Sequence, residues 1–385
     1  MVLKIGLMLC ISMMAATLPT VNGQNLEFFF TSLVDRAYPF EQEEVVNQED
    51  VSANMMQGWI EAALPWEIWD NDRIFEKDED VLVQEVDPVI PVVNYKEYQD
   101  EYFAGIPKDH FVTIQNDVPV IDMETVKSYY DSSLIQNFAK TVRLYNYDSE
   151  SMEPSPEYIN GEAFMAQDLT LSNEQLKGTE GPAVLIFHTH AHEGFVGKEE
   201  FGILDVAEYL EQILEQEYGI NVLHHKAVYD EGGVNGAYTR MGEDISQVLA
   251  ENPSIRVAID MHRDGVGEDT KLVTNVDGKD VAQIMLVTGV SRSYDENGKL
   301  QEISYLPNEN LDSVLAMGFQ MKMASDVLYP GFMRPLYLSC WRYSTYMLPR
   351  SMLLEVGAQT NTLEEAKAAM EPFAKLLVAI LQKEA

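Results

Sequence analysis

The sequence has 385 residues, and 63 acidic against 26 basic side chains give it a formal net charge of −37. Apolar residues make up 46% and charged residues 23%, which is ordinary for a globular protein and too apolar for wholesale disorder. We expect no nucleic-acid partner, because polyanions bind proteins that present clustered cations. The two cysteines, Cys10 and Cys340, are too few for a disulfide framework.

The first 23 residues have the pattern of an export signal or a membrane anchor. Lys4 gives a short positive start, residues 5–18 are apolar and uncharged, and a region of small residues follows up to Gly23. Cleavage and retention both fit this pattern. We therefore expect an extracytoplasmic protein that is either anchored to the cell membrane by its N-terminus or secreted after cleavage.

Two regions of different composition come next. Residues 24–110 are acidic, aromatic and poorly periodic, which predicts a partly ordered linker that docks on a partner or acts as a solvated stalk. Residues 111–180 alternate short strand-like and helical runs with turn signals such as Asn160-Gly161. This second region is expected to form a small accessory layer ahead of the main domain.

From residue 181 onward, buried strands alternate with amphipathic helices. The strands are expected at 184–187, 257–261, 284–287 and 352–356, and the helices at 203–218, 243–250 and 311–329. A last helix starts at Thr362, whose hydroxyl can cap it while Glu365 reaches back to complete a capping box. Residues 181–385 are therefore predicted to form an α/β domain with a mostly parallel sheet flanked by helices.

Polar side chains follow or end three of these strands, at the sheet edge where active sites gather. Three of the seven histidines lie within five residues directly after the first strand: His188, His190 and His192. Glu193 follows them, His262 comes directly after the second strand, and Glu355 lies near the end of the last strand. We expect these groups to meet in one site.

Two imidazoles and a carboxylate with an open position for water are the ligands of a catalytic zinc ion. His190, Glu193 and His262 fit this set, although His188 could replace His190; otherwise His188 and His192 lie beside the ligands or face the substrate. A zinc ion lowers the pKa of water towards about 7, and a nearby carboxylate passes the proton to the leaving amine. Glu355 is the candidate for that transfer, since a carboxylate is costly to bury in an apolar strand.

Five segments resemble the stage II sporulation protein P family: LIFHTHAHE (185–193), NGAYTR (235–240), IDMHRD (259–264), DGKDVA (277–282) and LEVG (354–357). The resemblance covers roughly residue 181 to the C-terminus, and the sequence before it matches only vaguely. His192 departs from the family pattern, which usually has threonine there, and so adds a possible ligand.

The resemblance implies a membrane-anchored, zinc-dependent cell-wall hydrolase of endospore-forming bacteria, acting on peptidoglycan at the sporulation septum during forespore engulfment. The implied activity is that of an N-acetylmuramoyl-L-alanine amidase with one Zn²⁺, and a second, endopeptidase activity on peptide cross-links stays open. The implied fold is of the amidase or zinc-carboxypeptidase type. The sporulation proteins D and M of the same stage are the implied partners.

Other residues of these segments suggest supporting roles. Arg240 and Arg263 could bind substrate carboxylates, for which their planar fork is suited, or could form ion pairs. Asp260, Tyr238 and Asn235 are candidates for orienting the ligands.

Two other functions stay open. One is a zinc carboxypeptidase or deacylase, because His-x-x-Glu followed by a distant histidine and a late glutamate also resembles that superfamily. The other is a catalytically silent wall-binding scaffold that recruits partners through the acidic N-terminal part.

Overall fold

The computed structural model describes residues 108–115, 118–140, 142–146, 151–153, 155–178, 181–234, 236–295 and 297–382. All of them belong to one compact unit within Pro65–Ala385. The predicted signal or anchor and nearly all of the predicted linker lie outside the described residues. No helix among the described residues is long and apolar enough to cross a membrane.

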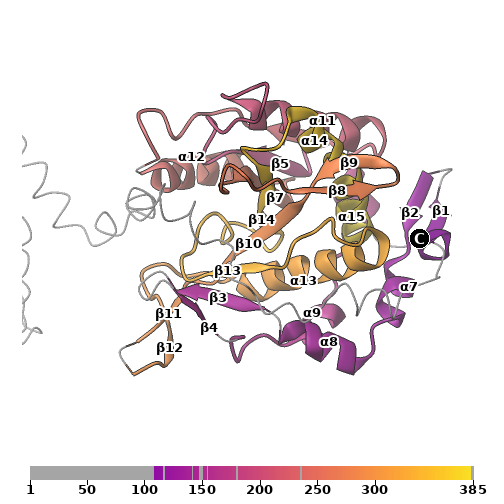
Figure 1. Ribbon diagram of the computed structural model, residues 1–385, viewed down its shortest axis with the longest axis horizontal. Coiled ribbons are helices and arrows are strands. Elements are labelled where there is room, and N and C mark those ends of the chain that lie inside the picture. Colours follow the sequence, from indigo (N-terminus) through magenta and orange to yellow (C-terminus); the bar gives the residue numbers. More distant parts are fainter. Residues whose placement is uncertain are drawn as a thin grey trace, which may run out of the picture. The chain divides into compact units, whose positions relative to one another are not determined.

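Eight strands form one mixed sheet in the order β4-β3-β13-β10-β14-β7-β5-β6 (Figure 1). Their bounds are β3 Arg143–Asn146, β4 Ser151–Glu153, β5 Val184–Phe187, β6 Val222–His224, β7 Val257–Asp264, β10 Ile284–Gly289, β13 Tyr337–Ser339 and β14 Ser351–Ala358. Strands β6, β5, β7 and β14 are parallel to one another, and so are β10, β13 and β3. The two groups join antiparallel at β10 and β14, and β4 is antiparallel to β3. The sheet is therefore mostly parallel, as predicted, but its direction reverses at β10.

Helices cover both faces of this sheet. The helices α11 (Gly202–Gln216), α13 (Leu311–Leu328) and α15 (Met370–Leu381) bury one face, and α12 (Ala237–Glu251) packs on the other (Figure 1). Neighbouring residues of a strand enter different cores: Ile186 belongs to the larger core and Leu185 to the core under α12. Because successive strand side chains point to opposite faces, a strand covered on both sides reads as a continuous apolar run.

The region 111–180 is built into the same body. It comprises β1 (Val112–Gln115), β2 (Val118–Ile121), α7 (Met123–Ser128), α8 (Ser132–Ala139), α9 (Gly161–Ala166), α10 (Asn173–Lys177) and the two strands β3 and β4, and the 3₁₀ helix η1 (Lys108–Phe111) precedes it. Strand β3 extends the main sheet beyond β13. Phe138 and Phe164 pack edge to face on Phe319 of α13, with ring centroids 4.6 and 5.9 Å apart. Residues before 181 therefore complete one edge of the sheet and cover α13.

Several predicted helices and strands are present but start or end at other residues than predicted. Strand β7 continues to Asp264, so His262 lies on the strand itself, and α12 starts at Ala237 rather than at 243. The predicted capping box at Thr362 is present, but the helix after it breaks into α14 (Leu363–Ala368) and α15. Asn160, which had the pattern of a turn residue, caps α9 by accepting the Ala163 N–H.

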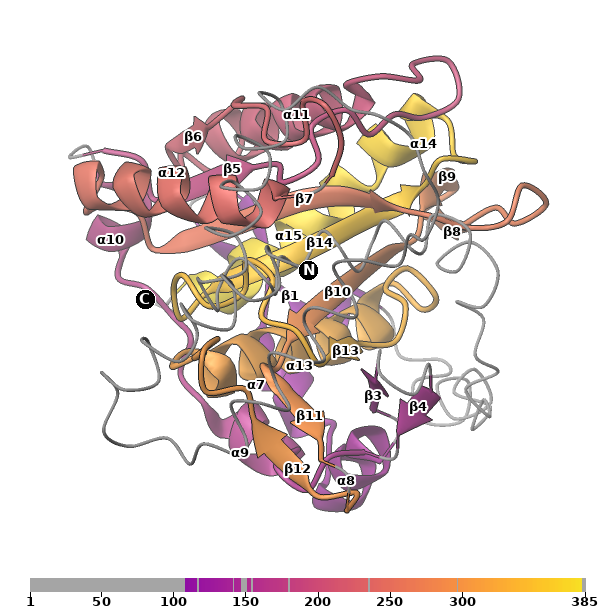
Figure 2. The ribbon, with the colours of Figure 1, turned by 90° about the vertical axis from the view of Figure 1, so that its left-hand side faces the viewer.

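Two hairpins extend from the sheet region and were not predicted. They are β8–β9 (Val273–Val276 and Lys279–Ala282), which lies beside α14, and β11–β12 (Arg292–Tyr294 and Leu300–Glu302). Figure 2 shows them at different ends of the fold. Their strands are short and partly exposed, so they lack the continuous apolar pattern of the buried strands.

Candidate metal centre

The three predicted ligands converge at the carboxyl ends of β5 and β7. The turn after β5 carries His190 and Glu193, and β7 carries His262. The two strands are parallel neighbours, with Phe187 opposite Asp260, so the chain that leaves β5 passes beside the end of β7. One ring nitrogen of each histidine and one carboxylate oxygen of Glu193 all lie within 4.8 Å of one another. The fold thus brings together residues about seventy positions apart.

The donor atoms have a spacing that suits one metal ion. Glu193 Oε1 lies 3.7 Å from His190 Nδ1, and Glu193 Oε2 lies 3.4 Å from His262 Nδ1. Donors of a tetrahedral zinc site lie about 3.3 Å apart, because each is about 2.0 Å from the ion. Two imidazoles and a carboxylate also leave a coordination position open, as in catalytic zinc sites. The group can therefore hold a metal, and this donor set fits zinc.

A buried carboxylate fixes the orientation of His262. Asp260 Oδ1 lies 2.9 Å from His262 Nε2, and the same carboxylate accepts hydrogen bonds from the backbone N–H (2.8 Å) and the hydroxyl (2.7 Å) of Thr189. With Nε2 turned to Asp260, Nδ1 of His262 faces Glu193. This is the carboxylate–histidine arrangement that orients metal ligands in other sites.

The charges of the cluster stabilise one another. Burial alone would lower the pKa of His262, but Asp260 and Glu193 raise it well above its ordinary value. Burial would raise the pKa of Glu193, but the charge of His262 and hydrogen bonds from His190 and His262 hold it well below its usual range. A proton on His262 thus balances the two carboxylates. A metal ion would have to displace that proton, so metal affinity should fall as the pH falls.

Glu355 lies on β14, beside the metal group. Its position in the parallel register is directly opposite His262, so both side chains lie on the same face of the sheet. The Oε2 atom of Glu355 is buried and has no hydrogen-bond partner. Burial and the nearby charge of Asp264 raise the pKa of Glu355 to about 8, although His262 opposes the shift. An acid that titrates near neutral pH in such a place can both accept and donate a proton.

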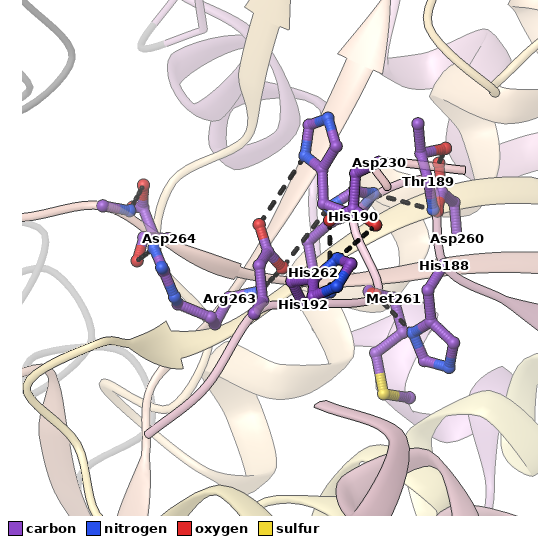
Figure 3. Close-up of polar contacts among 12 residues, drawn as sticks. His188, Thr189, His190, His192, Asp230, Asp260, Met261, His262, Arg263 and Asp264 are labelled. Atoms are coloured by element: carbon purple, nitrogen blue, oxygen red, sulfur yellow. Dashed lines mark hydrogen bonds and ion pairs between the residues drawn. The ribbon is translucent and has the colours of Figure 1, made fainter. Parts of the chain in front are cut away.

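The structure places His188 outside the metal group. Its Nδ1 lies 2.8 Å from the carbonyl oxygen of Met261 and its Nε2 lies 2.9 Å from Nε2 of His224. Burial lowers the pKa of His188 to about 4, which keeps the ring neutral, so its Nδ1–H donates to the carbonyl. His188 thereby ties the turn after β5 to β7 next to His262. Figure 3 shows His188, Thr189 and Asp260 to one side of the cluster, and Arg263 and Asp264 to the other.

His192 lies at the rim and is held by one buried residue. Asp230 accepts both the backbone N–H of His192 (3.1 Å) and its ring Nδ1 (2.9 Å) (Figure 3). The His192 ring packs on Phe201 with centroids 4.5 Å apart, and 40% of the side chain stays exposed. His192 therefore borders the site without belonging to the metal group.

The remaining predicted residues take different positions. The Nε and Nη2 groups of Arg240 both donate to the carbonyl oxygen of Tyr229. The backbone N–H of Arg263 donates to Glu193 Oε2 at 2.8 Å, while the Nε of Arg263 is buried without a hydrogen-bond partner. The Tyr238 ring lies edge-on to His190, with centroids 5.7 Å apart. Asn235 lies outside the described residues.

Sequence reasoning missed three residues that support the site: Asp230, His224 and Arg334. Asp230 and His224 hold His192 and His188, and Arg334 pairs with Asp264 at 2.5 Å. Each comes from a segment distant in sequence from its partner, and none stands in a recognisable motif. Only the fold identifies them.

A comparison with family models finds one match, described as Stage II sporulation protein P (SpoIIP), over residues 108–378. This match begins well before residue 181, from which the resemblance to this family was expected to run. Among solved structures, the N-acetylmuramoyl-L-alanine amidase AmiC2 of Nostoc punctiforme is similar at 16% identity, over 51% of this chain and 94% of that chain, with a TM-score of 0.27. No curated protein matches the sequence significantly.

Proposed function

The chain belongs to the stage II sporulation protein P family, and on that premise we propose that it is a zinc-dependent peptidoglycan hydrolase acting in sporulation. The bond we propose it cleaves is the amide between N-acetylmuramic acid and L-alanine of the stem peptide. The observation that carries this proposal is the metal group of His190, Glu193 and His262 beside Glu355, a half-buried acid whose Oε2 atom is buried without a hydrogen-bond partner.

The donor set fits Zn²⁺, which when bound would polarise the amide carbonyl and make water more acidic. The chain's own residues hold the ligands in place for this chemistry. Asp260, fixed by Thr189, orients His262, and the backbone N–H of Arg263 fixes the Glu193 carboxylate. Such pre-oriented ligands need little rearrangement during the reaction.

Glu355 carries the proton in this proposal. Its carboxylate accepts a proton from the attacking water and later donates it to the leaving amine nitrogen. In the metal-free protein, burial and the charge of Asp264 raise the pKa of Glu355. Its pKa would fall beside a bound dication, so the carboxylate would be ionised at neutral pH and ready for the first step.

The alternative functions would involve the same candidate metal centre in different ways. A zinc carboxypeptidase or deacylase would share the donor set, and so would an endopeptidase acting on peptide cross-links, so the products must decide among them. A silent scaffold would gain nothing from a carboxylate oxygen buried without a hydrogen-bond partner, since such an atom costs stability. This cost supports an enzyme over a scaffold.

We also propose a setting for the reaction, from family membership and the N-terminal pattern. The N-terminal segment would anchor the chain to the cell membrane, with the hydrolase domain outside the cytoplasm at the forespore septum. Peptidoglycan would be its substrate, and the sporulation proteins D and M its partners. Fractionation of sporulating cells and co-purification with tagged D or M test these two points.

The activity is tested by product analysis with the zinc-loaded full-length chain on purified peptidoglycan. The full chain is needed because β3, β4, α8 and α9 lie before residue 181 and form part of the fold. We expect release of stem peptides with a new amine on L-alanine, and none from His190→Ala. New amines at cross-links would indicate an endopeptidase, and release of single C-terminal residues a carboxypeptidase. Zinc binding without any product would favour the scaffold.

A further inference from the structure

Two arginines, Arg240 and Arg263, were expected to bind substrate carboxylates. They differ in how many of their guanidinium N–H groups already bond to the protein. Arg240 uses Nε and Nη2 on the carbonyl oxygen of Tyr229. It thereby fastens the loop whose next residue, Asp230, holds His192. Arg240 is therefore a positioning residue for the rim of the site, with its fork already occupied.

The guanidinium group of Arg263, in contrast, has N–H donors available for a ligand. Its Nε is buried without a hydrogen-bond partner, and its Nη1 donates a long bond of 3.3 Å to the carbonyl oxygen of Asp264. A buried donor without an acceptor costs free energy, and more so when the group is charged. The structure therefore leaves Arg263 short of an acceptor.

No carboxylate among the described residues neutralises the Arg263 guanidinium. Asp264, its neighbour in sequence, is paired with Arg334, and Glu193 is paired with His262. The backbone N–H of Arg263 donates to Glu193, and its side chain extends from there towards Asp264 (Figure 3). A guanidinium without a carboxylate partner among the described residues thus starts from the edge of the metal group.

We propose, on the basis of the amidase function proposed above, that Arg263 binds a carboxylate of the substrate peptide. Its planar fork matches a carboxylate with two parallel hydrogen bonds, whereas a carboxamide turns N–H donors towards it. The enzyme therefore discriminates between stem peptides with a free carboxylate at this position and those in which the same group is amidated.

The geometry indicates which carboxylate of the stem peptide Arg263 binds. The backbone nitrogen of Arg263 lies 2.8 Å from the Glu193 carboxylate, so its side chain starts at the edge of the metal group. A peptide extends by about 3.5 Å per residue, so the second residue beyond the scissile amide lies about 7 Å away, within the reach of an arginine side chain. We assign the α-carboxyl of the second stem residue to Arg263.

The test uses two disaccharide-tripeptides that differ only at the second residue, D-glutamate in one and D-isoglutamine in the other. For the zinc-loaded full-length chain we expect kcat/KM to be about 10- to 100-fold higher for the free carboxylate, mostly through KM, the usual range for a charged hydrogen bond. Arg263→Gln should remove this preference and Arg263→Lys should keep part of it. Arg256→Gln, on an arginine that bonds to the carbonyl oxygens of Pro253 and Ile255, should leave the preference unchanged.

Equal kcat/KM for the two substrates, or an unchanged preference in Arg263→Gln, would overturn the assignment. A binding measurement separates this outcome from failure of the amidase proposal. Calorimetry with zinc-loaded Glu355→Gln should show the same preference for the D-glutamate compound without turnover. If the wild type cleaves neither compound but calorimetry keeps the preference, the amidase proposal fails and the role of Arg263 stands; binding without preference overturns that role.

Discussion

Charged side chains lie buried or half-buried in two regions of the protein, and the two regions balance their charges differently. Inside the core, Lys322 and Asp326 lie one turn apart on α13 and form an ion pair. At the ends of β5, β7 and β14, the acids Glu193, Asp260 and Glu355 gather around His262. On α13 each charge has one opposite charge beside it. At the strand ends, three carboxylates surround one histidine, which can neutralise only one of them.

This difference separates a structural from a functional use of buried charge. A buried ion pair is close to neutral for stability, because the attraction offsets the cost of desolvation, so the α13 pair needs no role in catalysis. Glu355 forms no ion pair with a cation among the described residues, and burial and the charge of Asp264 raise its pKa. Groups with strongly shifted pKa values in such places tend to be functional.

The largest effect should come from Glu355→Gln, which removes the proposed proton carrier but keeps the shape of the side chain. We expect kcat on peptidoglycan to fall by about 10²- to 10⁴-fold, the range for general acid–base catalysis, with zinc content unchanged. Glu371→Gln, at a surface pair with Lys279, is the matched control and should leave kcat unchanged. An unaltered kcat in Glu355→Gln would mean that the charges at the strand ends, like the α13 pair, have no role in catalysis.

Substitutions in the Lys322–Asp326 pair of α13 should change the free energy of unfolding and leave activity unchanged. Lys322→Met leaves Asp326 buried without its cation and should lower the free energy of unfolding by about 3–5 kcal/mol. The double variant Lys322→Met/Asp326→Leu should recover most of this loss, because neither charge remains. Urea titrations measure both, and zinc content should match the wild type. Reduced zinc binding in the double variant would mean that the two regions are coupled.

A smaller effect is expected from Asp260→Asn, which keeps the side-chain size but weakens the hold on His262. Loss of a carboxylate that orients a metal-binding histidine commonly lowers metal affinity by about 10- to 100-fold. Competition with a chromophoric chelator measures the zinc Kd. Thr189→Val, which removes one of the two bonds from Thr189 to Asp260, should raise the Kd by less. An equal effect of the two variants would argue that Asp260 acts only through packing.

The pH dependence of the metal-free protein should give the mildest signal. The pKa of Glu355 is raised in the folded state to about 8, so its contribution to stability is complete below about pH 4.5 and is lost as the pH rises towards 8. His262, whose pKa is also raised, acts in the same direction above its ordinary pKa of about 6.5. Thermal unfolding in chelator should show Tm falling between pH 5 and 8, less steeply in Glu355→Gln. A Tm that rises with pH over this window in the wild type would contradict the assigned shifts.

The strands under both layers of helices could be predicted from the sequence because burial on two faces leaves a continuous apolar run. Strand β5 has the predicted ends, and the strands β7 and β14 differ from prediction only in length. The reversal at β10 could not be predicted, since the direction of a buried strand leaves no mark on its composition. Strand β13 has three residues, too few for a pattern.

The convergence of the candidate ligands was predictable for a related reason. His190 and Glu193 lie in the turn after β5 and His262 lies two residues before the end of the neighbouring β7, so topology alone brings them together. The separation of His188 from His190 depends on its bonds to Met261 and His224, which no spacing reveals. Asp230 holds His192 from 38 positions away, on a loop without a motif.

The most direct test of the central claim is the zinc content of the purified full-length chain and of matched histidine variants. We expect about one equivalent of zinc in the wild type and in His188→Ala, because the described residues contain one group of three candidate ligands and His188 lies outside it. His190→Ala and Glu193→Gln should bind almost none. Zinc retained in His190→Ala and lost in His188→Ala, or no zinc in the wild type, would contradict the metal centre described here.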